Sequence, residues 1–137
     1  MQSGDYHLVV DVWMRRSDGR YLLTRRAPTK GYALMWESTG GSAAAGEDSL
    51  TAALREAQEE AGMVLDAAKG RLVHSYRGRD HFKDVWVFEH EAELEDVTLQ
   101  EGEIVDCRLA TAEEIWQLYH DRELVPYTYL DVLFAEP

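Results

Sequence analysis

The sequence predicts an α/β sandwich, in which a mixed β-sheet packs against helices. Extended runs rich in β-branched and aromatic residues recur along the chain, and helical patterns lie between them. The length of 137 residues is typical of one domain and is sufficient for a substantial hydrophobic core. No repeat, low-complexity tract or linker interrupts the sequence, so we expect a single domain over residues 1–137.

The first third of the chain predicts a β-hairpin followed by a loop. Residues His7–Arg16 are apolar and β-branched and predict a strand. The turn residues Ser17–Gly19 lead into a second strand over Arg20–Arg26. A proline and a glycine within Ala27–Met35 favour a loop, and a short extended segment follows over residues 36–41.

A helix is predicted over Asp48–Ala61, with acidic residues at its start and Gly62 just past its end, where glycine commonly terminates helices. One face of this helix is apolar at helical spacing, and the small size of its side chains suits packing on a sheet. The residues of this face are Leu50, Ala53, Leu54, Ala57 and Ala61.

The second half of the chain adds strands and two further helices. Residues Arg71–Tyr76 and His81–Glu91 predict a hairpin, and Ile104–Leu109 predicts another strand. The sequence Thr111–Glu114 has the form of a capping box and opens a helix that reaches about residue 119. A short closing helix is expected over Tyr127–Phe134.

Charge and composition limit the function classes that this chain can serve. The net charge of −12 repels a phosphate backbone, which argues against general nucleic-acid binding. A small phosphorylated substrate remains compatible with this charge, because metal ions can supply positive charge locally. No apolar run reaches the ~20 residues needed to cross a bilayer, and the N-terminus lacks the pattern of a signal peptide. The single cysteine, Cys107, suits a reducing cytoplasm.

The most informative segment contains three glutamates that would share one helix face. Glu56, Glu59 and Glu60 stand at i, i+3 and i+4, where like charges repel one another. Two of them also lie at the helix C-terminus, where the macrodipole disfavours anions. Such consistent violation of local rules indicates a functional site. Carboxylate oxygens are the ligands that Mg²⁺ prefers, so these residues predict a magnesium site, which Mn²⁺ could also occupy.

The spacing around these glutamates matches a longer pattern, G-x5-E-x7-R-E-U-x-E-E-x-G-U, where U is a bulky aliphatic residue. Its fixed positions are filled by Gly41, Glu47, Arg55, Glu56, Glu59, Glu60 and Gly62. This segment resembles the box of the MutT-like Nudix family. Ala57 departs from the pattern at one aliphatic position, and Met63 fills the last one. The resemblance implies an α/β/α sandwich with a mixed sheet.

The Nudix resemblance further implies Mg²⁺-dependent hydrolysis of a nucleoside diphosphate linked to another group. It assigns the metal to the three box glutamates and to the backbone carbonyl of Gly40. Arg55 is expected to orient the carboxylates, with Glu47 as its partner. The general base is either Glu103, on a later loop, or the box residue Glu56. Relatives of this kind often dimerise, which leaves a homodimer open.

Residues that select the substrate are less well defined by the sequence. Arg25, Arg26 and Lys30 precede the box and are candidates for binding phosphates, although neighbouring strand residues must face opposite sides. The stretch LLTRRA resembles the start of a coenzyme A pyrophosphatase motif, but the continuation of that motif is absent. Aromatic residues that could stack on a base, or belong to the core, are Tyr32, Trp36, Tyr76, Phe82 and Trp86.

Two other functions remain open from the sequence. An isopentenyl-diphosphate isomerase relative would share the fold, but Gly40, Gly41 and Ser42 stand where such enzymes carry a catalytic cysteine and histidine. A binding module that has lost the reaction would also fit the pattern. Retention of every box glutamate argues against that alternative, because an inactive domain would have no reason to keep costly like-charge contacts.

Overall fold

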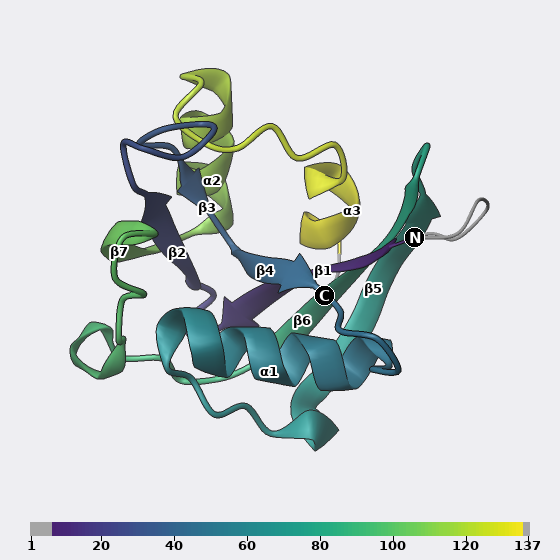
Figure 1. Ribbon diagram of the computed structural model, residues 1–137. Helices are drawn as coiled ribbons and strands as arrows, with labels where there is room; N and C mark the ends of the chain where they lie inside the picture. Colours follow the sequence, from purple (N-terminus) through teal and green to yellow (C-terminus); the bar gives the residue numbers. More distant parts are fainter. Residues whose placement is uncertain (1–6, 136–137) are drawn as a thin grey trace.

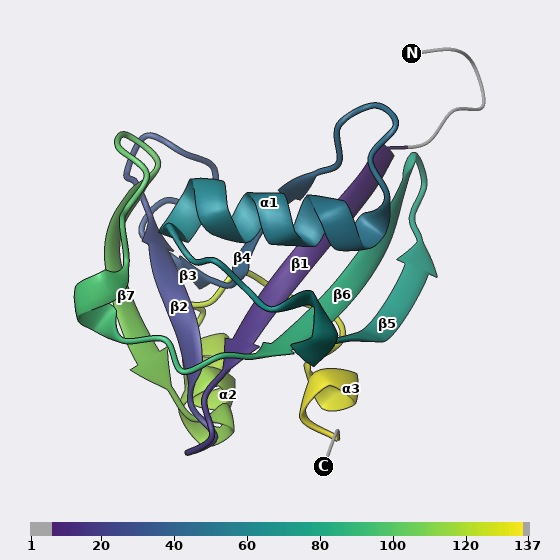
Figure 2. The same ribbon diagram turned by 90° about the horizontal axis from the view of Figure 1, so that it is seen from below.

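The computed structural model describes residues 7–135 and shows a seven-stranded mixed sheet with helices on both faces (Figures 1 and 2). Helix α1 covers one face, and α2 and α3 lie on the other. The strands are β1 (His7–Arg15), β2 (Tyr21–Arg26), β3 (Trp36–Glu37), β4 (Thr39–Ser42), β5 (Gly70–Arg77), β6 (His81–Glu89) and β7 (Ile104–Ala110). The helices are α1 (Ser49–Ala61), α2 (Ala112–His120) and α3 (Leu130–Phe134), with short 3₁₀ turns at Ala67–Lys69 and Leu94–Asp96.

The sheet is mixed, as the sequence predicts. Its main path runs β3-β2-β1-β6-β5, with β4 paired to β1 and β7 paired to β2. Strands β1 and β6 are parallel, and the other pairs are antiparallel. The predicted α/β class is therefore confirmed.

Strands β1 and β2 separate from one another soon after their shared turn. Their only paired residues are Arg15 and Tyr21 within the described part of the chain. Beyond this point β4 occupies the inner edge of β1, and β3 occupies the inner edge of β2. Figure 2 shows the two strands diverging, with α1 lying across them. The split makes room for β4, which lies against the helix that carries the acidic motif.

Alternation along β1 builds two separate cores. Val10, Val12 and Met14 pack against α1, whereas Trp13 points to the opposite face and packs beneath α2 and α3. All four side chains are fully buried. A sheet that is covered on both faces requires apolar residues at successive strand positions, which explains the nearly continuous apolar run in this strand.

Helix α1 begins and ends as its sequence predicts. The Asp48 side chain caps the helix by accepting a hydrogen bond from Thr51 N at 2.8 Å. Gly62 ends it in the left-handed conformation, with φ of 72°. On the face toward the sheet, Ala53, Ala57 and Ala61 are fully buried and the two leucines are partly buried, as expected. Their small side chains bring the helix close to β1 and β4.

The closing helix is shorter than the sequence suggests. The capping box of α2 is present, but α3 starts at Leu130 rather than Tyr127. The reason is that Tyr127 and Tyr129 are buried and hydrogen-bonded elsewhere in the sheet, to Ser38 and Asp11 respectively. These tertiary bonds keep the segment from joining the helix. None of the helices in residues 7–135 has the length and hydropathy that a bilayer crossing requires.

Candidate functional site

The glycine pair of β4 lies directly beneath the acidic face of α1. A Cβ atom added to Gly41 would lie 2.4 Å from Glu56 Oε2, so the Glu56 carboxylate packs onto the bare glycine backbone. A Cβ added to Gly40 would lie 2.5 Å from the carbonyl oxygen of Val10 on β1. Both positions therefore require glycine, because the Glu56 carboxylate approaches Gly41 closely and strand β1 approaches Gly40 closely.

Arg55 connects the box glutamates to one another. Its Nε donates to Glu47 at 2.7 Å, and its Nη1 donates to Glu56 at 2.8 Å and to Glu59 at 2.9 Å. Nη2 donates to the carbonyl oxygen of Ser42 at 3.0 Å. The predicted pairing with Glu47 is confirmed. One planar guanidinium thus fixes carboxylates from both ends of the helix relative to β4.

The pKa values of these carboxylates shift in different directions. Hydrogen bonds from Arg55 lower the pKa of Glu47, whose side chain is 11% exposed and which also accepts the backbone N–H of Ala44. Burial raises the pKa of Glu56, and the positive charge of Arg55 only partly offsets this effect. Hydrogen bonds to Glu47 and Glu56 raise the pKa of Arg55 itself, so this guanidinium remains a permanent positive charge in the site.

Glu60 occupies the least favourable environment of the box residues. Its Oε1 atom is buried and has no hydrogen-bond partner. Burial raises the pKa of Glu60 to about 8, and the negative charges of Glu37 and Glu56 add to the effect. The backbone amide of Gly40 opposes the shift only in part. A buried carboxylate oxygen without a partner costs free energy unless a cation or donor is supplied.

The box carboxylates do not form a ready-made metal cage. Within residues 7–135, no group of three or more histidine, cysteine, aspartate or glutamate side chains is close enough together to hold a metal ion. Arg55 lies between Glu56 and Glu59, and Glu60 points toward β4. The donor set nevertheless fits a hard divalent cation, because the buried oxygen of Glu60 lacks a partner next to a second carboxylate.

Sequence reasoning missed a fourth carboxylate, Glu37. It lies at the end of β3, is largely buried, and pairs with Arg26 at 2.8 Å. Burial raises the pKa of Glu37 despite this partner. Its negative charge acts on Glu60, so the split between β1 and β2 gathers acidic groups from β3 and α1. The only local signal was a charged residue next to Ser38, which separates β3 from the glycine pair of β4.

The three predicted phosphate-binding side chains all have protein partners. Arg26 Nε donates to the carbonyl oxygen of Gly31 at 2.6 Å, in addition to its pair with Glu37. Lys30 forms an ion pair with Glu103, and its charge also acts on Glu37 and Glu60. The structure therefore brings Lys30 and Glu103 to the edge of the acidic cluster, although they are far apart in sequence.

Arg25 faces a different direction from Arg26, as alternation along a strand requires. Its Nε donates to the carbonyl oxygen of Leu34 at 2.9 Å, and its guanidinium lies 5.5 Å from the ring of Trp36. A second guanidinium, that of Arg108, lies 5.7 Å from the same ring. Trp36 packs against the core beneath α2 and α3, so Arg25 belongs to that side of the sheet.

A buried polar network that the sequence analysis did not identify lies on the opposite sheet face. Asp11 is 7% exposed and accepts a hydrogen bond from Tyr129 Oη at 2.5 Å. Lys83 Nζ lies 3.2 Å from the same carboxylate oxygen, and Trp13 Nε1 donates to Tyr129 Oη at 3.0 Å. The interruption of an apolar strand by a single aspartate was the only local sign of this network.

Comparison with known proteins identifies the family. A family model described as the NUDIX domain matches residues 5–130. The chain belongs to the Nudix family. Two curated relatives, both uncharacterised Nudix hydrolases, come from Listeria monocytogenes (38% identical) and Listeria innocua (39% identical). Each match spans 136 residues, which is 98% of this chain and 80% of the relative. The protein is therefore a Nudix hydrolase, a class of enzyme that acts on pyrophosphate bonds.

Solved structures confirm the MutT-like Nudix fold. A Deinococcus radiodurans protein, DR0079, has a TM-score of 0.77 at 22% identity, covering 100% of this chain and 88% of its own. The MutT Nudix hydrolase of Burkholderia pseudomallei has a TM-score of 0.74 at 19% identity, with coverages of 94% and 97%. The MutT protein of Methanosarcina mazei has a TM-score of 0.70 at 21% identity, with coverages of 98% and 95%.

Proposed function

We propose that this Nudix hydrolase is Mg²⁺-dependent and cleaves the diphosphate of a nucleoside diphosphate linked to another group. The observation that carries the proposal is the buried, partnerless Oε1 atom of Glu60 beside the Glu56 carboxylate. A divalent cation would pair with this oxygen and would also offset the negative charges of Glu37 and Glu56 nearby. Glu56, Glu59, Glu60 and the Gly40 carbonyl would hold Mg²⁺, or alternatively Mn²⁺.

The bound ion would neutralise diphosphate charge and lower the pKa of a coordinated water. The chain's own residues position the reactants. Arg55 holds Glu56 and Glu59 in place, and its role is to orient rather than to react. Arg26 and Lys30 supply positive charge at the edge of the cluster, and an arriving phosphate would compete with their present carboxylate partners.

Hydrolysis requires a base to remove a proton as water attacks phosphorus. The new bond joins the water oxygen to phosphorus, the bridging P–O bond breaks, and the base takes the proton. We assign this role to Glu103, which the ion pair with Lys30 keeps close to the acidic cluster. Glu56 is the alternative, because its carboxylate packs on Gly41 within the cluster itself.

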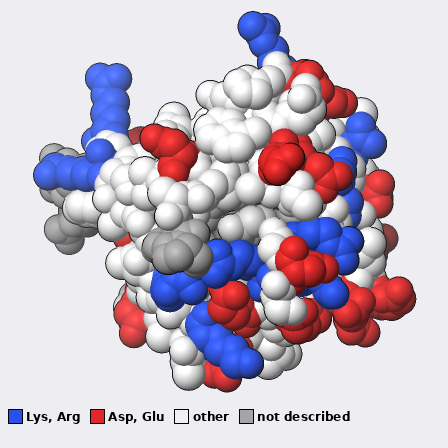
Figure 3. Space-filling view, turned by 180° about the vertical axis from the view of Figure 1, so that it is seen from behind, with Lys and Arg blue, Asp and Glu red and all other residues white. Residues whose placement is uncertain are grey.

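The charge distribution favours a small substrate over a nucleic acid. Figure 3 shows one face on which acidic and basic side chains are interspersed, rather than a continuous basic surface. Surface arginines pair with carboxylates, as in Arg15 with Glu89 and Arg16 with Glu93. With a net charge of −12, long-range attraction of a phosphate backbone is not expected. A cytoplasmic location would fit the free cysteine.

Phosphate and nucleotide release from a panel of nucleoside triphosphates, dinucleotides and sugar nucleotides tests this proposal. We expect turnover that requires Mg²⁺ and that Glu103→Gln lowers by roughly 10²–10⁴-fold. Glu56→Gln should in addition raise the Mg²⁺ concentration needed for half-maximal rate. Conversion of isopentenyl diphosphate without release of phosphate would identify an isomerase instead. Saturable substrate binding without any turnover would identify a binding module.

The two base assignments predict different kinetics. If Glu103 is the base, Glu103→Gln lowers kcat and leaves the Mg²⁺ requirement unchanged, because this residue is not assigned to the metal. Glu101→Gln, two residues away on the same loop, is the matched control and should retain activity. Equal activity of Glu103→Gln and wild type would assign the base to Glu56.

A further inference from the structure

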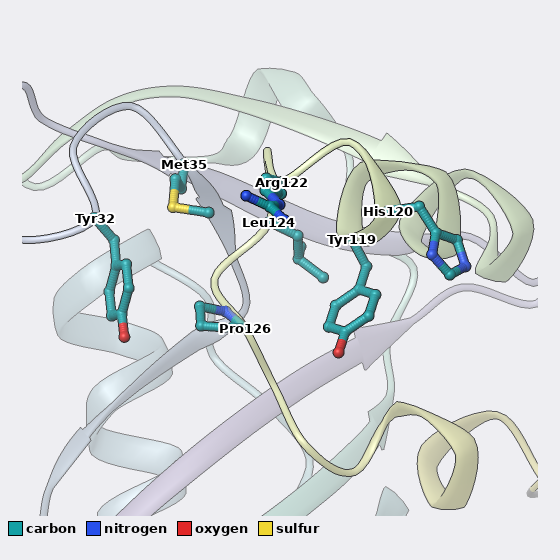
Figure 4. Close-up of a pocket in the computed structure, with 7 residues that line it drawn as sticks. All are labelled: Tyr32, Met35, Tyr119, His120, Arg122, Leu124 and Pro126. Atoms are coloured by element: carbon teal, nitrogen blue, oxygen red, sulfur yellow. The ribbon is translucent and has the colours of Figure 1, made fainter.

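A groove lies on the sheet face that carries α2 and α3. Tyr32 and Pro126 border both of its cavities, a larger one of about 590 Å³ and a smaller one of about 210 Å³. Figure 4 shows Tyr32 and Tyr119 on either side of Leu124 and Pro126 in the larger cavity. We call the two cavities together the C-terminal groove. The larger cavity has the size of typical small-molecule sites.

The larger cavity combines aromatic walls with an unusual backbone. Tyr32 is 57% exposed, although its ring borders an apolar hollow. Among residues 7–135, only Tyr32, Leu34 and Arg122 adopt positive φ without being glycine, at 52°, 62° and 60°. Two of them, Tyr32 and Arg122, line this cavity, and Leu34 lies in the same loop as Tyr32. Such conformations are costly and concentrate at ligand-binding sites, where neighbouring structure maintains them.

The smaller cavity contains a charged group held in a fixed position. Lys83 and Tyr129 line it, and Asp11 holds both of them through its Oδ2 atom. The Lys83 side chain is 20% exposed and that of Asp11 is 10% exposed. An ammonium has three N–H donors, so the pair with Asp11 leaves donors for a ligand in the cavity. A nearly buried ion pair is costly, and an apolar pair would serve the core equally well.

The smaller cavity adjoins the strand that faces the acidic cluster. Tyr127 lines this cavity, and its hydroxyl accepts a hydrogen bond from Ser38 N at 2.9 Å. Asp11 Oδ1 lies 3.1 Å from the position that a Cβ on Gly40 would occupy. The loop that carries Tyr32 also carries Lys30, and Arg26 holds that loop at Gly31. A diphosphate placed at Gly40 and Lys30 could therefore extend into the groove.

We propose that the C-terminal groove binds the organic group of the substrate, a planar heterocycle such as a nucleobase. Tyr32 provides the stacking surface, and Lys83 donates a hydrogen bond that determines specificity. An apolar chain is the weaker occupant, because it would cover the Lys83 ammonium without offering an acceptor. This inference rests on the proposed function, since it assumes that the diphosphate lies beside Gly40.

Calorimetric titration of the metal-free protein with AMP, GMP, CMP and UMP tests the groove without requiring turnover. Ribose 5-phosphate and geranyl monophosphate serve as probes that lack the heterocycle. We expect the nucleotides to bind more tightly than both probes. Tyr32→Leu should weaken nucleotide binding by roughly tenfold, as expected for loss of stacking, whereas Tyr32→Phe should not. Lys83→Met should weaken binding of the preferred nucleotide by roughly tenfold and should make the affinities for the four bases more similar.

The matched control is Lys69→Met, because Lys69 is exposed and lines a separate cavity. Unchanged nucleotide affinities in both Tyr32→Leu and Lys83→Met would overturn the inference, as would equal binding of ribose 5-phosphate or tighter binding of geranyl monophosphate. Absence of measurable nucleotide binding would also overturn it. Thermal melts confirm that each variant is folded, and Tyr32 is exposed enough that its replacement does not disturb the core.

Kinetics separate this inference from the proposed hydrolase activity. If both hold, Tyr32→Leu raises KM for the preferred diphosphate substrate by roughly tenfold and leaves kcat nearly unchanged. If Tyr32→Leu hydrolyses the substrate with an unaltered KM, the groove does not bind the heterocycle, and the proposed hydrolase activity stands. If nucleotide binding depends on Tyr32 but no diphosphate is hydrolysed, the proposed hydrolase activity is refuted, and the binding role of the groove stands.

Discussion

Replacement of Glu60 by glutamine should stabilise the metal-free protein. The Oε1 atom of Glu60 is buried without a partner, and Glu37 and Glu56 add negative charge around it. An unsatisfied buried charged group costs on the order of 1–3 kcal/mol or more. Because burial raises the pKa of Glu60 to about 8, the folded protein without metal must hold a proton on this carboxyl at pH 7.5, whereas the unfolded chain does not. Glutamine has nearly the same shape and is neutral without taking up a proton. We therefore expect Glu60→Gln to raise the free energy of unfolding by about 1–2 kcal/mol, a fraction of that cost, because an amide atom stays unpaired.

For a chain of 137 residues, this gain corresponds to a rise in Tm of about 3–10 °C. The assay is calorimetric melting at pH 7.5 with EDTA and then with saturating Mg²⁺. At an Mg²⁺ concentration of 100 times Kd, the wild type should gain about 2.7 kcal/mol, whereas the variant should gain less. The difference between the melting temperatures of Glu60→Gln and the wild type should therefore become smaller, or change sign, when Mg²⁺ is added.

Glu59→Gln is the matched control for this experiment. The Glu59 side chain is 56% exposed and pairs with Arg55 at 2.9 Å, so its charge is already solvated and compensated. We expect its replacement to change the stability of the metal-free protein by less than about 1 kcal/mol. A Glu60→Gln protein that melts below the wild type in EDTA would refute the argument, because it would show that the carboxylate stabilises the empty site.

Three further outcomes are expected. Gly41→Ala should lower kcat/KM by at least about tenfold, because the added methyl would lie 2.4 Å from Glu56 Oε2. Gly31→Ala is the control: its added methyl would meet nothing within 4 Å, so this variant should remain active in the same assay. Arg55→Lys should lower the free energy of unfolding by about 1 kcal/mol in denaturant titrations, since one ammonium cannot replace the several bonds of the guanidinium. Burial lowers the pKa of His90 below 6.5, so the unfolded chain binds more protons there and stability falls as the pH decreases below that value. His90→Asn should reduce this fall in melts between pH 7.5 and 5.5, and an unchanged profile would contradict the assignment.

Much of the fold follows from local sequence patterns. The strands of the first half, helix α1 with its Asp48 cap and Gly62 terminus, and the capping box of α2 all agree with expectation to within a residue or two. These features depend on side-chain periodicity and on backbone preferences that act over a few residues. The exception is the segment around Tyr127 and Tyr129, whose bonds to β1 and to the β3–β4 junction prevent a longer helix.

The sequence also predicted the family from the spacing of the box residues and, through that resemblance, the pairing of Arg55 with Glu47, which lies just before the helix. It could not predict that Glu60, rather than Glu59, would be the buried carboxylate, since burial depends on where β4 crosses the helix. Glu37, the Lys30–Glu103 pair and the Asp11–Lys83 pair were equally invisible. Their partners are distant in sequence and are brought together by tertiary pairing, namely of β2 with β3, of the Ala27 backbone with Glu103, and of β1 with β6. Local order comes from the chain itself, whereas charge environment is a property of the assembled sheet.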